Sequence, residues 1–179
     1  SRDVGRAGES DQVRRAAAKV LEEMGDTGVV DPLIAALRDE HKWVRQAAAK
    51  ALGKFGGRQA VEPLAVLLYD ADGDVVRQAA ESLTEIGTPA IDALVGALDC
   101  DQDQTRNCTV SALAKIKDPR VVSLLIEALT DNSLAVRGGA ARALGEIGDR
   151  RAVEPLIAML QESNHWLRVT ALEALSKIG

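Results

Sequence analysis

The chain has 179 residues, of which 46% are hydrophobic but only 2% aromatic, and its formal net charge is −5. Its apolar residues are therefore mainly Ala, Leu, Val and Ile, which suit closely stacked helices. The negative charge argues against a general attraction to nucleic acid or to anionic membranes. The apolar runs fall far short of the roughly 20 residues that span a bilayer. No signal-peptide pattern occurs in residues 1–10, so the expected location is cytoplasmic.

Taken in chain order, the sequence repeats itself with a nearly constant period. A polar lead-in at 1–10 is followed by a single helix at 11–25, which is half a repeat. Five predicted helix pairs follow, which we number repeats two to six: 29–56, 60–87, 90–117, 121–148 and 152–179. An arginine recurs near the start of each second helix, at spacings of 31, 32, 29, 31 and 31 residues. A fixed period of this length is typical of repeat architectures.

Local signals mark where the helices of each pair begin and end. In three repeats the first helix has a proline in its first turn, directly after an acidic residue: Pro32, Pro63 and Pro155. A missing N–H costs nothing there, and the carboxylate favours the positive end of the helix dipole. The second helices end in glycine, except that repeat four has Lys117. Glycine adopts the left-handed conformation that often follows a helix. No stretch alternates with a period of two, so the sequence predicts no strand.

Repeats three and four depart from the pattern. A match of repeat three without gaps places Val76, instead of Arg77, at the arginine position. Keeping Arg77 there removes one residue, which rotates the following side chains by about 100°. A local adjustment near 70–74 is preferred, but the sequence leaves this register open. Repeat four has one extra residue in its turn, at 99–104. Any break in the curvature of the array is expected across these two repeats.

These patterns resemble the HEAT-repeat superfamily, and most closely its short form, the PBS-lyase HEAT-like repeats. The matching segments are AVEPLIAML at 152–160, the Val-Arg steps at 44–45 and 136–137, and ALGEIGD at 143–149. The resemblance covers the chain from residue 11 onward, as one repeat domain at 11–179. It implies an all-α, right-handed solenoid, with the proline-containing helices outside and the arginine-containing helices inside. It also implies a scaffold for binding more than any one activity.

The repeated arginines are interpreted as structural. Each follows an acidic turn residue, and a guanidinium group can bond a carboxylate and turn carbonyls at the same time. A residue present in every repeat serves the stack more readily than a ligand. The sequence therefore predicts a ladder between adjacent repeats, made of Asp39 and Arg45, Asp70 and Arg77, Asp99 and Arg106, Asp131 and Arg137, and Glu162 and Arg168.

Two tryptophans mark the candidate contact points for a partner. Trp43 and Trp166 share one position at the start of the second helix, where other repeats have polar or small residues. Exposed Trp is a common anchor at protein interfaces. The alternative is that each ring folds over the turn and packs on its own repeat, and the two readings stay equally open. The candidate partner-binding residues are Trp43, Gln46, Lys50, Trp166 and Val169.

No catalytic, cofactor or metal site is predicted. Cys108 lies where other repeats have Ala or Gly and is expected in the core, whereas Cys100 is expected in an accessible turn without an activating neighbour. His41 and His165 belong to repeats four apart, too distant to share a metal. The acidic turn at 70–74 lacks the glycine that a calcium loop has at its sixth position, which makes it a weak signal for calcium.

The sequence thus favours a non-catalytic scaffold that binds another protein along its inner face and turn edge. The alternative, implied by the resemblance, is a bilin lyase-type enzyme or a subunit of one. Nucleic-acid binding ranks third, because charge and aromatic content speak against it. Neither end looks capped, which is expected of a fragment of a longer array or of ends covered by self-association or by another part of an assembly.

Overall fold

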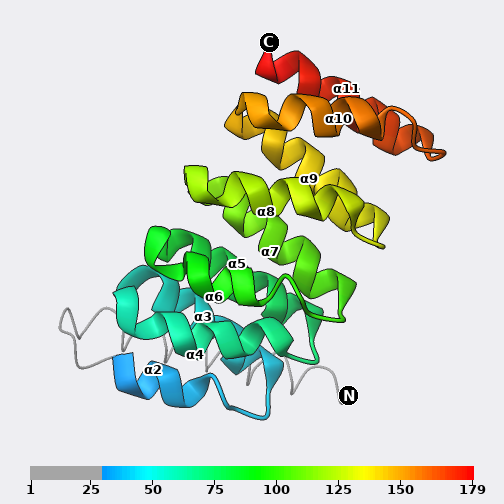
Figure 1. The fold of residues 1–179 in the computed structure, drawn as a ribbon. Coiled ribbons are helices and arrows are strands. Elements are labelled where there is room, and N and C mark those ends of the chain that lie inside the picture. The colour runs from blue at the N-terminus through cyan, green and yellow to red at the C-terminus, as the bar shows by residue number, and fades with distance from the viewer. Residues whose placement is uncertain (1–29) are drawn as a thin grey trace. The chain divides into compact units, whose positions relative to one another are not determined.

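The computed structural model describes residues 30–179, and this part of the chain is helical without any strand. The predicted lead-in at 1–10 and the half repeat at 11–25, with Arg14, lie outside the described residues. From residue 30 onward, five helix pairs follow one another in the order expected (Figure 1). The prediction of an all-α solenoid of antiparallel helix pairs is confirmed for this part of the chain.

The chain divides into two compact units between residues 93 and 94, within repeat four. The described part of unit 1 contains α2 (Val30–Ala36), α3 (Lys42–Phe55), η2 (Gly57–Ala60), α4 (Val61–Val66), η3 (Leu67–Tyr69), α5 (Gly73–Ile86) and η4 (Thr88–Ala90). The division falls inside α6 (Ile91–Gly96). Unit 2 continues with α7 (Asp103–Ile116), η5 (Pro119–Val121), α8 (Val122–Glu127), η6 (Ala128–Thr130), α9 (Leu134–Ile147), η7 (Arg150–Ala152), α10 (Val153–Met159) and α11 (His165–Ile178).

The first helix of several pairs is an α-helical segment preceded by a 3₁₀ turn. In repeats five and six an aspartate begins this turn by accepting a backbone N–H two residues on: Asp118 from Arg120 and Asp149 from Arg151, each at 2.9 Å. The same aspartates are paired with the side chains of these arginines. The side-chain cap satisfies a backbone donor that lacks an intrahelical partner.

The second helices end in two different ways. Gly148 has φ 74° and Lys117 has φ 55°, so both residues adopt the left-handed conformation, for which lysine is an unusual choice. Gly56 differs from the expectation, because it keeps a right-handed φ of −79° and the following Gly57 takes the positive φ. A side chain at Gly56 would instead collide with Ala60.

The core of each unit lies between and beneath the paired helices. Its largest fully buried side chains are leucines: Leu52, Leu64, Leu68 and Leu83 in unit 1, and Leu94, Leu113, Leu125, Leu144, Leu156 and Leu167 in unit 2. Successive second helices approach closely because small residues face each other. A Cβ atom on Gly53 would lie 2.8 Å from the Cα of Ser82, and one on Gly145 would lie 2.7 Å from the Cα of Ala174. Within residues 30–179, no helix is long and apolar enough to cross a membrane.

Candidate interaction surface

A recurring arginine fixes the turn within repeats two, four, five and six. It is the fourth residue of the second helix, which we call the Arg position. Its Nη1 donates to the carbonyl oxygen six residues earlier, at what we call the turn position. The distances are 2.9 Å from Arg45 to Asp39, 2.7 Å from Arg106 to Cys100 and 2.7 Å from Arg168 to Glu162, and Arg137 bonds the Asp131 carbonyl in the same way. Each repeat thus uses its arginine to close its own turn.

Arg45, Arg106 and Arg137 each reach a carboxylate of the following repeat, and Arg106 also bonds Asp103 of its own repeat at 2.8 Å. Arg45 donates from Nε and Nη2 to the two oxygens of Asp70, at 2.7 and 2.9 Å. Arg106 binds Asp131 in the same bidentate manner, at 2.8 and 3.0 Å. Arg137 reaches Glu162 at 3.4 Å. The sequence predicts that each arginine pairs with the acid of its own turn, so the observed carboxylate pairing of Arg45, Arg106 and Arg137 differs from the prediction by one repeat.

The register of repeat three follows the gapless match. The fourth residue of α5 is Val76, which is 1% exposed, and Arg77 is the fifth. Arg77 therefore lies outside the ladder and donates to Asp74 at 2.7 Å, with 58% of its side chain exposed. The predicted pair of Asp70 with Arg77 is wrong, because Asp70 is bonded to Arg45.

Repeat four departs from the ladder at its turn position. That position is held by Cys100, whose carbonyl accepts from Arg106 and whose Sγ accepts from the backbone N–H of Gln102 at 3.4 Å. In repeats two, three and five the equivalent backbone N–H, two residues on, donates to an Asp side chain, as from Ser133 to Asp131 at 2.7 Å. The prediction of Asp99 as a ladder residue is therefore wrong by one position, because Cys100 occupies the turn position. Repeat three lacks the arginine and repeat four lacks the carboxylate at their corresponding positions.

The ladder perturbs the protonation of its carboxylates. Burial raises the pKa of Asp70, but the hydrogen bonds from Arg45 and from the Asp72 backbone outweigh it, so the pKa is lowered overall. The pKa of Asp131 is lowered in the same way, by Arg106 and the Ser133 backbone against the effect of burial. Both carboxyl groups are accordingly ionised near neutral pH.

The candidate residues of unit 1 form one surface, patch 1, made of Trp43, Gln46 and Lys50 on α3. Their spacing of three and four residues places them along one helix face. Trp43 is 53% exposed and Lys50 is exposed, whereas Gln46 is half-buried. The Nζ of Lys42 lies 4.9 Å from the centre of the Trp43 ring, a cation–π contact.

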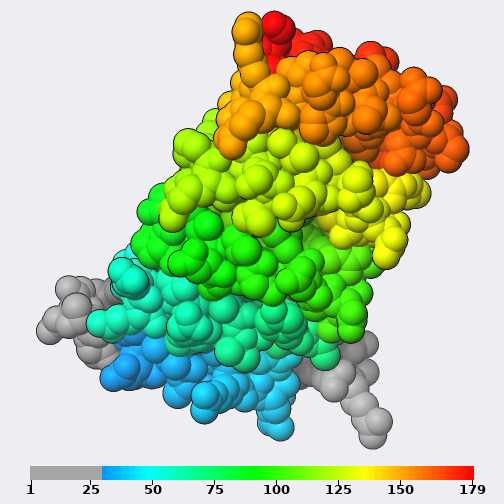
Figure 2. All heavy atoms as spheres, in the orientation of Figure 1, coloured from blue at the N-terminus to red at the C-terminus, as the bar shows by residue number. Residues whose placement is uncertain are grey.

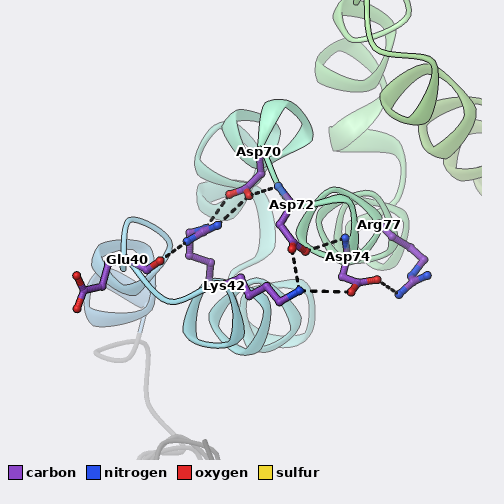
Figure 3. A network of polar contacts seen from close by, with 7 residues as sticks. Glu40, Lys42, Asp70, Asp72, Asp74 and Arg77 are labelled. Atoms are coloured by element: carbon purple, nitrogen blue, oxygen red, sulfur yellow. Dashed lines mark hydrogen bonds and ion pairs between the residues drawn. The ribbon is translucent and has the colours of Figure 1, made fainter. Parts of the chain in front are cut away.

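Lys42 is itself held by the acidic turn of repeat three. Its Nζ donates to Asp72 at 2.8 Å and lies 3.9 Å from Asp74 (Figure 3). The hydrogen bond to Asp72 raises the pKa of Lys42 against the opposing effect of burial. Figure 3 also shows Arg77 extending from Asp74 on the side away from Asp70. The turn edge beside patch 1 is thus an ordered network of opposite charges.

The candidate residues of unit 2 form patch 2, made of Trp166 and Val169 on α11. Trp166 is 39% exposed and Val169 is 48% exposed. The Trp166 ring lies against Gly138 of α9, where any Cβ would collide with it, and the Arg142 guanidinium lies 6.0 Å from the ring centre. The ring therefore packs on the preceding repeat and not on its own. The contact of Trp166 with the preceding repeat was not predicted from the sequence. Its signal was Gly138, a glycine at the fifth position of a second helix.

The two cysteines and the two histidines do not come together in a reactive site. Cys108 is half-buried and not in the core, and Cys100 is also half-buried. Cys100 lines a surface pocket with Arg106 and four aspartates, but that guanidinium is already bonded to Cys100, Asp103 and Asp131. His41 is the N-cap residue of α3 in unit 1, whereas His165 is the first residue of α11 in unit 2. No group of three or more potential metal ligands converges among residues 30–179.

Comparisons with known proteins agree with this geometry. A family model for HEAT repeats matches residues 5–84, 65–137 and 122–179. The chain is similar to the structure of the CpcE–CpcF complex of phycocyanin lyase from Nostoc sp. PCC7120, with a TM-score of 0.60 and 25% identity. That match covers 67% of this chain and 78% of the other. No curated protein matches the chain.

Two further similarities concern the fold alone. A designed armadillo repeat protein in complex with the peptide (KR)4 has a TM-score of 0.58 at 19% identity, over 96% of this chain and 90% of the other. Human deoxyhypusine hydroxylase has a TM-score of 0.52 at 19% identity, over 94% and 80%.

Proposed function

Because this chain belongs to the HEAT-repeat family, we propose that it is a non-catalytic scaffold that binds another protein. The binding surface is the exposed face of the second helices together with the adjoining turns. Patch 1 and patch 2 are the contact points on the two units. This function involves no nucleic acid, membrane or cofactor.

The observation that carries the proposal is that the two tryptophan rings are exposed and already held in place by neighbouring residues. Trp43 has an exposed ring beneath a lysine that Asp72 holds in place, and Trp166 has an exposed ring seated on Gly138. Large aromatic side chains that are already ordered lose little conformational entropy on binding, which makes them effective interface anchors. The Arg ladder supports this function by keeping the turns beside them rigid.

The proposal is tested by photocrosslinking followed by affinity measurement. A photoreactive residue at Gln46, beside Trp43, is expected to capture a partner from a native lysate, whereas one at Glu62 on the exposed side of α4 is not. With the captured partner purified, Trp43→Ala or Trp166→Ala is expected to weaken binding by roughly tenfold or more. Val66→Ala is the matched control, because Val66 is 71% exposed on α4. Equal effects of the tryptophan variants and the control would place the binding surface elsewhere.

A second candidate function is favoured by the similarity to the CpcE–CpcF complex. In that case the chain is a bilin lyase-type enzyme or a subunit of one. Titration of the protein with a linear tetrapyrrole then produces a saturable change in the chromophore's absorbance. An unchanged spectrum at micromolar protein leaves the scaffold as the better account.

A further inference from the structure

Basic side chains gather along unit 2 at the connections between its repeats. Lys117 and Arg120 lie in the connection from α7 to α8, and Arg150 and Arg151 lie in the connection from α9 to α10. The Nη2 of Arg151 donates to the carbonyl oxygen of Pro119 at 3.3 Å, so the two connections are in contact. In Figure 2 these connections, light green and orange, reach the left margin of unit 2. We call the four basic residues the basic edge.

The side chains of the basic edge are all exposed. Arg120 and Arg151 each bind the aspartate of their own connection through Nε and Nη2, at 3.0 and 2.8 Å. These bonds fix both guanidinium groups while 65% and 57% of the two side chains stay exposed. A side chain that is already ordered loses little conformational entropy on binding. Within the described part of the chain, no carboxylate is paired with Lys117 or Arg150. The edge therefore has more cations than its two aspartates neutralise.

This charge is not a general property of the repeats. The corresponding connections of unit 1, Gly57–Ala60 and Thr88–Ala90, hold Arg58 and no other charged residue. The turns within the repeats of unit 2, at the opposite ends of its second helices, are acidic: they hold Asp99, Asp101, Asp103, Asp131 and Glu162. Opposite charges at two edges orient a charged partner as it approaches. An acidic partner is thus attracted to the basic edge and repelled from the turns.

Lys117 is held in a backbone conformation that does not suit lysine. Its φ of 55° and ψ of 35° are left-handed, and glycine adopts this conformation at the same place in the next repeat, at Gly148. A Cβ atom there costs free energy that glycine avoids. Residues held in such conformations cluster at functional sites. Because the exposed ammonium group has no carboxylate within residues 30–179 to offset this cost, the choice of lysine indicates a role in binding.

We propose that the basic edge binds an acidic segment of a partner protein, rich in aspartate or glutamate. The carboxylates of that segment bind Lys117 and Arg150 and lie over the exposed guanidinium groups of Arg120 and Arg151. The contact between the two connections brings both within reach of one short segment. Because the edge shares no residue with patch 1 or patch 2, the inference does not rest on the proposed function.

Fluorescence anisotropy of a labelled oligoglutamate peptide tests the proposal. Titration with the full chain at low ionic strength is expected to show saturable binding that weakens as salt is added. Arg150→Gln is expected to weaken this binding by roughly threefold. Arg58→Gln is the matched control, because Arg58 is an exposed arginine in a connection of unit 1 and its loss changes the net charge of the chain equally. The control is expected to leave the affinity unchanged.

A second variant, Lys117→Gly, separates binding from folding. It is expected to weaken oligoglutamate binding by roughly threefold. The same variant is expected to unfold at a higher temperature, because glycine suits the left-handed conformation. A loss of affinity in a more stable chain cannot arise from a damaged fold.

The proposal is overturned if oligoglutamate does not bind, if Lys117→Gly leaves the affinity unchanged, or if Arg150→Gln and Arg58→Gln act alike. Oligouridylate and vesicles containing phosphatidylserine are titrated in parallel. Tighter binding of either one, with the same loss in Arg150→Gln, would assign the basic edge to nucleic acid or to a membrane surface and would also overturn the proposal.

Discussion

At the scale of single residues, Arg45 joins two consecutive turns. It bonds the Asp39 and Glu40 carbonyls at 2.9 and 3.0 Å on one side and the Asp70 carboxylate on the other. Its side chain is 16% exposed and that of Asp70 is 9% exposed, so water screens the pair only weakly. Removal of either partner leaves the other partly buried and unsatisfied, which costs more than the loss of a surface ion pair.

We predict that Asp70→Asn lowers the free energy of unfolding by about 1.5–3 kcal/mol, the range for hydrogen bonds to charged groups. Urea unfolding followed by circular dichroism measures the change. Glu62→Gln is the matched control, because Glu62 is an exposed carboxylate on α4 of the same repeat. Its expected effect is within about 0.5 kcal/mol. An Asp70→Asn midpoint no lower than that of the control would contradict a stabilising ladder.

The sequence identified four ladder arginines but wrongly included Arg77, and it could not supply the carboxylate partners. Composition and period single out Arg45, Arg106, Arg137 and Arg168. Arg45 binds the carboxylate of Asp70 in the next repeat, but only the backbone carbonyl of Asp39 in its own turn. Which carboxylate an arginine reaches depends on the distance between the turns of stacked repeats, and the sequence does not give that distance. Cys100, and not the predicted Asp99, lies six residues before Arg106 and supplies the turn carbonyl. That spacing, constant in the other repeats, was the better guide.

At the scale of elements, helix ends were predictable because their signals are local. The first-turn prolines and the terminal glycines mark bounds that agree with the structure to within a few residues. The breakup of first helices into α and 3₁₀ segments was not predictable, since it depends on packing against the second helix. The burial of Cys108 was overestimated for a similar reason, because the sixth position of α7 is only partly covered.

Lys117 provides a test of the helix-end argument. It holds a φ of 55° where Gly148 serves in the next repeat. Lys117→Gly is expected to raise the free energy of unfolding by about 0.5–1 kcal/mol, because glycine adopts the left-handed conformation without a Cβ clash. Lys115→Gly, two residues earlier and also exposed, is the control and is expected to destabilise by about 1 kcal/mol. Thermal unfolding compares the two, and effects of the same sign would refute the explanation.

At the scale of the whole molecule, the acidic turns couple stability to pH. The pKa of Asp118 and of Asp149 is lowered from 3.8 to about 2, chiefly by the side-chain hydrogen bond from Arg120 or Arg151 and then by a backbone N–H. The pKa of Asp70 and of Asp131 is lowered as well. A depressed folded-state pKa stabilises the fold above the unfolded-state value and ceases to do so as pH falls through the folded-state value.

The melting temperature is therefore expected to fall progressively between about pH 4 and pH 2 through these carboxylates. Circular dichroism melts at pH 7, 4, 3 and 2 measure the decline. The double variant Asp118→Asn and Asp149→Asn should have a shallower decline over this interval than the original chain. A melting temperature that is constant down to pH 2, or an equal slope in the double variant, would show that the turn carboxylates do not govern acid stability.

Val76 and Cys100 stand where other repeats have an arginine and a carboxylate, and they constrain how the repeats of this chain can be exchanged. Most repeats carry an arginine to offer forward and a carboxylate to receive, so they are interchangeable modules in recombination or design. Repeat three offers no arginine from its Arg position, and repeat four has at its turn position a thiol that accepts only from the backbone N–H of Gln102. Arg45 of repeat two and Asp70 of repeat three lie in the same unit, and exchanging one of these repeats without the other leaves a ladder partner unpaired. Repeats two and three of unit 1 are therefore best duplicated, deleted or exchanged together.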